Sequence, residues 1–249
     1  MGVNKSTDLI TVEDFHKSFG DKHIHRGVSF NVKKGECLGL VGGSGTGKSV
    51  LLRTLIGLER PDMGQVFYDN LPLHNFNEQQ FNNVRKKVAY AFQGGALFDS
   101  MTVYDNMAYP LREHTDLSEK EIEKKIKNLL VDFGLAGNEK TYPGQLSGGM
   151  QKRVGLARAI ILEPDVILYD EPTAGLDPLN TRNIQDLILR LKTTGVTSIL
   201  VTHDMPVVNA VCDRIAVLMN GRIEALGTFD EINRDHNDLM SRFAKGELK

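Results

Sequence analysis

The pattern of apolar and polar positions predicts a strand, a loop and a helix in the first quarter of the chain. Residues 37–41 are almost all apolar, which is typical of a parallel strand buried on both faces. Over 48–58 the apolar residues recur at helical spacing, and Gly57 and Pro61 end that pattern. Because a glycine-rich stretch separates the two segments, we predict strand, glycine loop and helix in direct succession.

Further apolar segments extend this pattern over the whole chain. Additional strands are predicted at 9–12, 28–32, 166–169, 197–202 and 214–219. Helical patterns lie between the later strands, notably over 179–192. Strands that alternate with helices predict an α/β fold in which a mainly parallel sheet is covered on both faces.

The segment 94–158 is different because it shows helical patterns without a clear strand. Ser118 followed by Glu121 forms a capping-box pattern, which marks the start of a helix. The apolar residues that follow share one helical face, while Lys and Glu occupy the other. They are Ile122, Ile126, Leu129, Leu130 and Phe133. We therefore predict a helical subdomain at about 94–158, inserted into a core formed by about 1–93 and 159–249.

Composition is that of an ordinary globular protein with a sizeable core, since 41% of the 249 residues are hydrophobic and 25% are charged. The net charge of −2 gives no reason to expect nucleic acid as a partner. Cys37 and Cys212 stand among apolar neighbours and are expected to be reduced core residues. No apolar run reaches the roughly eighteen residues of a membrane span, and 1–13 lacks a signal-peptide pattern. The pattern over 229–243 predicts a last helical segment, and no appended regulatory domain is expected.

The glycine-rich stretch follows the pattern G-x-x-x-x-G-K-[ST], which binds nucleotide phosphates when a strand precedes it and a helix follows it. Its glycines allow the backbone N–H groups at the helix start to approach anionic oxygens closely. Lys48 is expected to contact the β- and γ-phosphates, and Ser49 to bind Mg²⁺. Taken alone the pattern could be a turn that binds nothing. The stretch comprises Gly42, Gly43, Ser44, Gly45, Thr46, Gly47, Lys48 and Ser49.

Two consecutive acids follow the predicted strand at 166–169. A buried strand with this ending can bring one carboxylate to a metal ion and the next to a water molecule. We expect Asp170 to hold Mg²⁺ through water and Glu171 to polarise the attacking water. Because acids at a strand end are also common on a solvated sheet edge, this pattern gains its weight from the glycine loop.

The segment 146–151, with the sequence Leu-Ser-Gly-Gly-Met-Gln, resembles the signature motif of ABC-transporter ATPases. A serine hydroxyl and glycine N–H groups before a helix form an anion site. In that family the site completes a nucleotide pocket on a second subunit. The resemblance therefore implies that Ser147, Gly148 and Gly149 contact ATP held by another copy, in a head-to-tail dimer. Met150 stands where many members have Gln, but the Ser and Gly positions are intact.

Other positions match the same family in order along nearly all of the chain. Phe19 resembles the aromatic residue that stacks on adenine, as a Phe in place of the commoner Tyr. Gln93 resembles the glutamine that contacts Mg²⁺ and water and couples the site to transmembrane subunits. The segment 174–177, which ends at Asp177, resembles the loop that crosses the dimer interface beside the nucleotide, and His203 resembles the histidine that contacts the γ-phosphate. Since Glu171 is present, the resemblance implies hydrolysis at both sites of a homodimer.

The resemblance also implies a fold, a location and cofactors. The expected fold is that of a phosphate-loop (P-loop) NTPase, with a RecA-like parallel sheet, an N-terminal antiparallel β subdomain and the helical insertion. One nucleotide-binding domain would span 1–249, with ATP and Mg²⁺ as cofactors. The chain would work in the cytoplasm, on the inner face of the bacterial inner membrane.

Three functions compete at this point: the energy subunit of a membrane transporter, an ABC protein of DNA repair or translation, and another phosphate-loop enzyme such as a small-molecule kinase. The signature motif argues against the kinase. A repair ATPase would contain a long coiled coil, and a translation factor would usually contain two such domains. A single copy without a coiled coil favours the transporter.

The segment 92–115 resembles the ATPases of Mla-type phospholipid transport systems. This resemblance implies a permease, an MCE-domain lipid-binding protein and, in many systems, a STAS-domain subunit as partners. Ala96, Leu97, Phe98 and Tyr109 would then offer an apolar groove to the coupling helix of the permease, unless they pack the core of the insertion itself. The alternative is an importer of polar amino acids, because its ATPase has the same nucleotide motifs.

Overall fold

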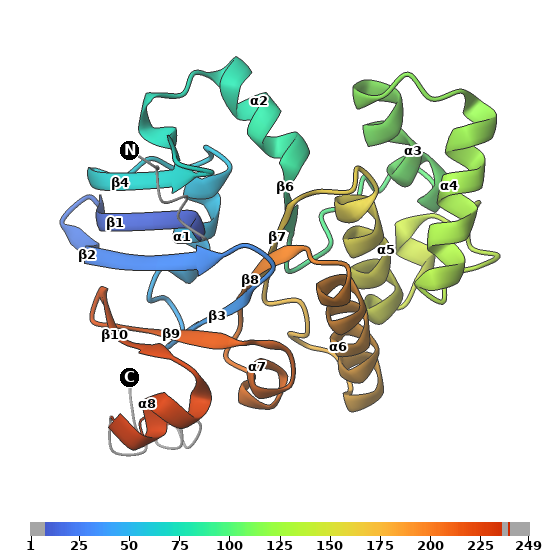
Figure 1. Ribbon diagram of the computed structural model, residues 1–249. Helices are drawn as coiled ribbons and strands as arrows, with labels where there is room; N and C mark the ends of the chain where they lie inside the picture. The colour runs from blue at the N-terminus through green and yellow to red at the C-terminus, as the bar shows by residue number, and fades with distance from the viewer. Residues whose placement is uncertain (1–7, 236–238, 240–249) are drawn as a thin grey trace.

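The computed structural model describes residues 8–235 and 239, which form two sheets and a group of helices beside them (Figure 1). All neighbouring strands of the first sheet are antiparallel. Their order across the sheet is β2 (Lys22–Lys33), β1 (Asp8–Phe19), β4 (Met63–Tyr68) and β5 (Leu71–Pro72). This is the N-terminal antiparallel subdomain that the resemblance implied.

The second sheet is parallel except at one edge, where β10 pairs antiparallel with β9. Every residue of its strands β3, β7 and β8 is buried, which explains their continuous apolar sequences. The strand order is β10 (Arg222–Gly227), β9 (Arg214–Met219), β3 (Cys37–Gly42), β8 (Thr197–Val201), β7 (Val166–Asp170) and β6 (Val88–Ala91).

Alternate residues of this sheet pack into two different hydrophobic clusters. On one face Val166 and Leu168 join helix α1 (Lys48–Leu55), which also contacts β4 of the first sheet. On the other face Ile167 and Tyr169 join residues of α6 (Pro178–Thr193) and α7 (Met205–Val211). The sheet is therefore covered on both faces, as predicted.

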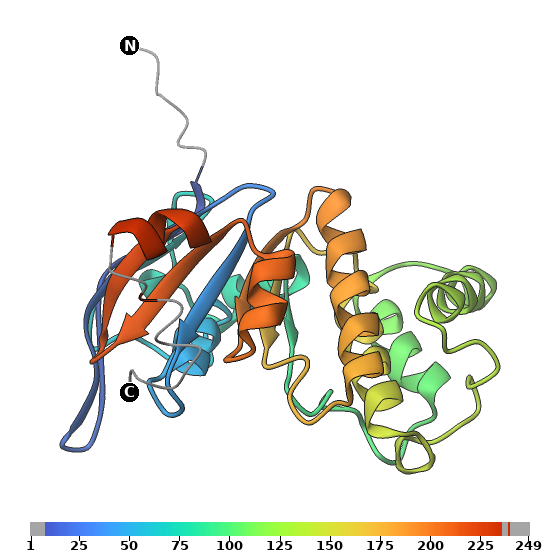
Figure 2. The same cartoon turned by 90° about the horizontal axis from the view of Figure 1, so that it is seen from below.

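Three helices of the predicted insertion lie together on one side of the molecule, beside α6 (Figures 1 and 2), and the last of them contacts β6 of the sheet. They are α3 (Val103–His114), α4 (Glu119–Asp132) and α5 (Gly148–Ile160). The capping box at the start of α4 is present, and Ile122, Ile126 and Leu130 of that helix are buried. The boundaries at 94 and 158 stay a prediction.

The six predicted strands are all present, whereas several short elements were not predicted. These are β4, β5, β6, β10, α7 and α2 (Glu78–Lys87). The predicted terminal helix begins as α8 (Phe229–Asp235), and most of its remainder lies outside the described residues. No helix within the described residues is long and apolar enough to cross a membrane.

The two cysteines come together although 175 positions separate them in sequence. Their sulfur atoms lie 3.9 Å apart, and both residues are free thiols. Cys37 is fully buried in β3, and Cys212 is half-buried directly after α7. The hydrogen bond from Cys37, and after it burial, raise the pKa of the Cys212 thiol.

Candidate nucleotide site

The phosphate-loop pattern occupies the turn between β3 and α1, where a glycine is required at the helix start. Gly47 is the N-cap of α1 and has a φ of 94°. A Cβ atom on Gly47 would lie 2.4 Å from Ile24 and 2.6 Å from His25. Since only glycine fits both this φ and this spacing, the loop can approach the first sheet closely while its N–H groups remain available at the helix start.

Lys48 is buried at the base of this loop. Its Nζ donates hydrogen bonds to the carbonyl oxygens of Gly42 and Gly43, at 2.8 and 2.9 Å. Burial lowers the pKa of Lys48, and the negative charges of Glu171 and Asp170 oppose that shift. The ammonium group is thus held beside the loop, within reach of a phosphate bound there.

Ser49 and Asp170 meet at the same place, although 121 positions separate them. The Ser49 hydroxyl donates to Asp170 Oδ1 at 2.8 Å, and the Tyr90 hydroxyl donates to Asp170 Oδ2 at 2.7 Å. A hydroxyl and a carboxylate are oxygen ligands of the kind that Mg²⁺ prefers. Burial and the hydrogen bond to Asp170 raise the pKa of Tyr90. Tyr90 was missed in the sequence because it belongs to β6, which is four residues long.

Glu171 follows β7 with a strained backbone and a partly exposed side chain. Its φ is 50°, and its N–H donates to the Val201 carbonyl at 2.8 Å. Oε1 lies 3.0 Å from Nδ1 of His203, whereas Oε2 is buried and has no hydrogen-bond partner among the residues described. A carboxylate held in this way can accept a proton from water.

Lys48, Ser49, Glu171 and His203 line one cleft of about 810 Å³, whereas Thr46 and Asp170 are not part of its lining. Gln93 and Phe19 lie at its wall, and the Phe19 ring is 47% exposed. The lining also includes Ile24 and Val201, which the sequence did not single out. Of the predicted residues, the cleft is lined by Phe19, Gly42, Gly43, Ser44, Gly45, Gly47, Lys48, Ser49, Gln93, Glu171 and His203.

The signature residues do not line this cleft. Ser147 is the N-cap of α5, and its hydroxyl accepts a hydrogen bond from the Met150 N–H at 3.3 Å. Ser147 and Gly148 are exposed, and Gly149 is buried. Asp177 is exposed at the start of α6, where it accepts from the Asn180 N–H at 2.9 Å. The chain therefore presents a second serine- and glycine-containing helix start, at a place separate from the cleft.

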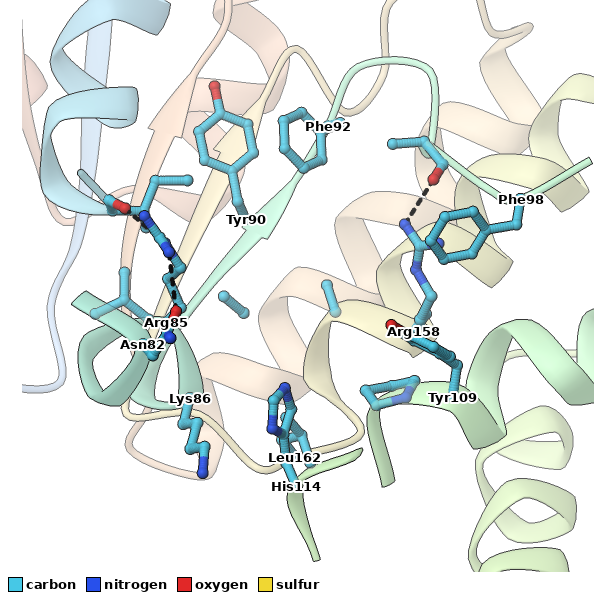
Figure 3. A pocket seen from close by; sticks show the side chains of 16 residues that line it. Asn82, Arg85, Lys86, Tyr90, Phe92, Phe98, Tyr109, His114, Arg158 and Leu162 are labelled. Atoms are coloured by element: carbon cyan, nitrogen blue, oxygen red, sulfur yellow. Dashed lines mark hydrogen bonds between the residues drawn. The ribbon is translucent and has the colours of Figure 1, made fainter. Parts of the chain in front are cut away.

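A groove of about 420 Å³ separates α2 and β6 from α3 and the C-terminal part of α5 (Figure 3). Arg158 donates hydrogen bonds to the carbonyl oxygens of Gly95 and Ala96, at 3.2 and 2.8 Å. The Phe98 ring lies 5.5 Å from the Arg158 guanidinium and makes an edge contact with Tyr109. These contacts fix the segment after Gln93 against α5.

The expected apolar surface is only partly correct. Ala96, Phe98 and Tyr109 line the groove, whereas Leu97 packs against the buried core. In the described part of the chain, the groove is also lined by basic side chains and by no acidic one. The basic residues are Arg85, Lys86, His114 and Arg158. The groove is thus both aromatic and positively charged.

The model of one protein family, described as "ABC transporter", matches residues 25–174. This chain belongs to the ABC transporter family. The ABC chain is 39% identical to the "Probable ribonucleotide transport ATP-binding protein mkl" of Mycobacterium bovis, over 99% of its own length and 67% of that protein's. It is 38% identical to the "Protein TRIGALACTOSYLDIACYLGLYCEROL 3, chloroplastic" of Arabidopsis thaliana, over 98% of this chain and 76% of that one.

The chain is also similar to the ATP-binding protein of a methionine import system and to a solved ATP-binding cassette. The chain is 41% identical to the "Methionine import ATP-binding protein MetN" of Chlamydia pneumoniae, over 90% of its length and 67% of that protein's. The ATP-binding cassette MJ0796, solved as a dimer in a post-hydrolysis state with ADP and Pi, superposes with a TM-score of 0.82 and 30% identity, over 88% of this chain and 98% of that one. This ABC chain binds ATP with Mg²⁺ and hydrolyses ATP.

Proposed function

We propose that this ATPase powers phospholipid transport between bacterial membranes, as part of an Mla-type system. The segment 92–115 carries this proposal, because its sequence resembles that of Mla-type ATPases and its residues Phe92, Phe98 and Tyr109 line the groove. The relative from Arabidopsis, whose name is that of a glycerolipid, supports a lipid substrate. The mycobacterial and chlamydial relatives are named for ribonucleotides and methionine.

The groove is the proposed docking site for a cytoplasmic helix of the permease. A helix with an apolar face can pack on Phe98 and Tyr109, and a carboxylate on it can meet Lys86 or His114. The same groove wall continues into Gln93, which lines the nucleotide cleft. Movement of a docked permease helix would therefore reach the nucleotide.

In the proposed reaction two copies of the chain pair head to tail and enclose two ATP molecules. Lys48 would hold the β- and γ-phosphates, and Ser49, Gln93 and Asp170 would hold Mg²⁺, which when bound would supply positive charge beside the phosphates. Oε2 of Glu171 accepts a proton from the attacking water, while His203 fixes Oε1 and contacts the γ-phosphate.

Two further parts of the proposed site contact the nucleotide: an aromatic ring on the adenine side and the signature segment of the other copy. Phe19 offers its exposed ring face to adenine. Ser147, Gly148 and Gly149 of one copy, together with Asp177, close the site of the other copy. None of these four residues lines the cleft of its own chain, which supports a site shared between two copies.

Transport in proteoliposomes tests the proposed substrate. The chain, its permease and the MCE-domain protein are reconstituted, and transfer of a fluorescent phospholipid to acceptor vesicles is followed with ATP. Transfer that requires ATP, and that a Glu171→Gln complex does not perform, is the expected result. ATP-driven uptake of methionine by the same assembly, without lipid transfer, would favour the alternative of a polar amino-acid importer.

A further inference from the structure

A lysine ties the first turns of α5, the signature helix whose N-cap is Ser147, to the loop that precedes α6. Lys152 lies on α5, and its Nζ donates a hydrogen bond to the Ala174 carbonyl oxygen at 2.5 Å. Ala174 begins the segment 174–177, which was predicted to cross the dimer interface. The lysine therefore joins two segments that both face a second copy in the proposed dimer.

A second contact joins the same two segments nearer to the anion site. A Cβ atom on Gly149 would lie 2.6 Å from both Cγ and Oδ1 of Asn180, so the signature backbone packs directly on that side chain. Asn180 in turn donates its N–H and its Nδ2 to the two carboxylate oxygens of Asp177, at 2.9 and 2.5 Å. The loop is thus held at Ala174 by Lys152 and at Asp177 by Asn180, which itself packs on Gly149.

The surroundings of the lysine restrict what it can do. Lys152 is half-buried, and burial lowers the pKa of its ammonium group, while the negative charge of Glu171 opposes that shift. Lys152 does not line the nucleotide cleft. It can therefore act on hydrolysis in two ways: by placing the 174–177 loop, or through the charge of Glu171 in its own chain.

We propose that Lys152 is a positioning residue that fastens the 174–177 loop to the signature helix, so that both segments reach the partner's nucleotide as one unit. The proposal rests on the head-to-tail pairing proposed above. Its direct consequence is that a Lys152 defect appears at the ATP bound by the partner subunit. An effect through Glu171 would appear instead at the ATP bound by the defective chain itself.

Heterodimers can separate these two consequences, because Glu171→Gln inactivates one chosen site. The two chains carry different affinity tags, so that mixed dimers can be purified. In the first heterodimer one chain carries both Lys152→Met and Glu171→Gln, and the other is wild type. Its working site uses the signature helix that lacks Lys152. In the second heterodimer the two substitutions lie on different chains, so the working site uses an intact signature helix and the Glu171 of the Lys152→Met chain.

Hydrolysis by each heterodimer is compared with that of a Glu171→Gln and wild-type pair. We expect the first heterodimer to be slower by about tenfold, as loss of a hydrogen bond from a charged donor implies. The second should stay within about twofold of the reference. Three outcomes would overturn the proposal: a slow second heterodimer with a normal first one, equal rates in both heterodimers, or no change of rate in either.

Two variants distinguish positioning from general damage. Lys152→Arg keeps a charged donor near Ala174. When it replaces Lys152→Met in the first heterodimer, most of the lost hydrolysis rate should return. Lys125→Met removes a lysine of α4 that pairs with Glu163 on the surface, and it should leave every rate unchanged. Each chain should also keep its ATP affinity when isolated. Failure of the pairing itself is recognised separately, by the absence of any dimer-dependent hydrolysis in the reference pair.

Discussion

Two glycine-containing segments at helix starts are proposed to bind phosphate oxygens in this chain, and their surroundings differ. The segment 42–49 lies in a cleft, with Lys48 at its base and Asp170 beside it. At the second segment, Ser147 and Gly148 face solvent, and outside the adjoining residues and backbone of its own helix no described atom lies within 4 Å of a Cβ built on Gly148. The first segment is built into a pocket, whereas the second is presented at the surface.

This difference explains why one chain holds two segments of similar chemistry. The first has a lysine, a carboxylate suited to a metal ion and, in Glu171, the proposed base for water. The second has only a hydroxyl and backbone N–H groups at the start of α5. An anion-binding surface without metal ligands or a base is suited to close a site whose other parts belong to another chain.

The largest expected effect is that of Glu171→Gln, which removes the base and keeps the shape. Hydrolysis should fall by about a thousandfold, since a general base contributes on that order. ATP binding should persist, and the ATP-bound dimer should accumulate on gel filtration. Asp186→Asn, on the exposed side of α6, is the control and should keep its rate. Unchanged turnover in Glu171→Gln would exclude this carboxylate as the base.

Lys48→Ala should act on binding. Without the ammonium group beside Gly42 and Gly43, the affinity for Mg-ATP should fall by about ten- to a hundredfold, as loss of a charged contact implies. Titration of the isolated chain with a fluorescent ATP analogue measures this. Ser147→Ala in the same assay should bind like the wild type, because Ser147 does not line the cleft. Equal losses in both variants would contradict the comparison.

The first segment should also make stability depend on pH, through His25 beneath Gly47. Burial lowers the pKa of His25 from 6.5 to about 4. Between these values the unfolded chain binds the proton more readily, so stability falls as the pH falls through this window. From pH 7 to pH 5 the loss due to His25 should reach about 2 kcal/mol. Urea unfolding at both pH values measures this loss of stability. The loss should disappear in His25→Leu and should persist in His74→Leu, which changes an exposed histidine.

The smallest expected effect distinguishes two neighbouring glycines. Gly149→Ala forces Asn180 to move, so it should lower the free energy of unfolding by about 1–2 kcal/mol. Gly148→Ala meets no described atom and should change it by less than about 0.5 kcal/mol. Thermal unfolding of the isolated chain measures both. An equal loss at Gly148 would mean that this residue is packed within its own chain.

Local patterns predicted the elements that form the first half of the site. The strand at 37–41, the glycine loop and the acids after 166–169 are contiguous in sequence, and the parallel sheet brings their ends together. The resemblance placed Phe19, Gln93 and His203 at the same cleft, where the structure also has them.

Contacts between distant elements were not predictable in the same way. Tyr90 reaches Asp170 across 80 positions, and Lys152 reaches Ala174 across 22. Neither residue lies in a motif. Each makes one hydrogen bond whose partner is determined by how the strands or helices pack, and that packing cannot be read from local sequence. Leu97 shows the same limit, since its apolar side chain suited the groove and the core equally well by sequence.

The claim that each site is shared between two copies has one direct test. Lys48→Ala chains lack a working first segment, and Ser147→Arg chains carry a bulky cation at the second. Neither variant should hydrolyse ATP alone. A mixture should regain activity, approaching a quarter of the wild-type rate at equal amounts, because half of the dimers are mixed and each contains one intact site. No activity at any mixing ratio, with both variants folded, would contradict the account.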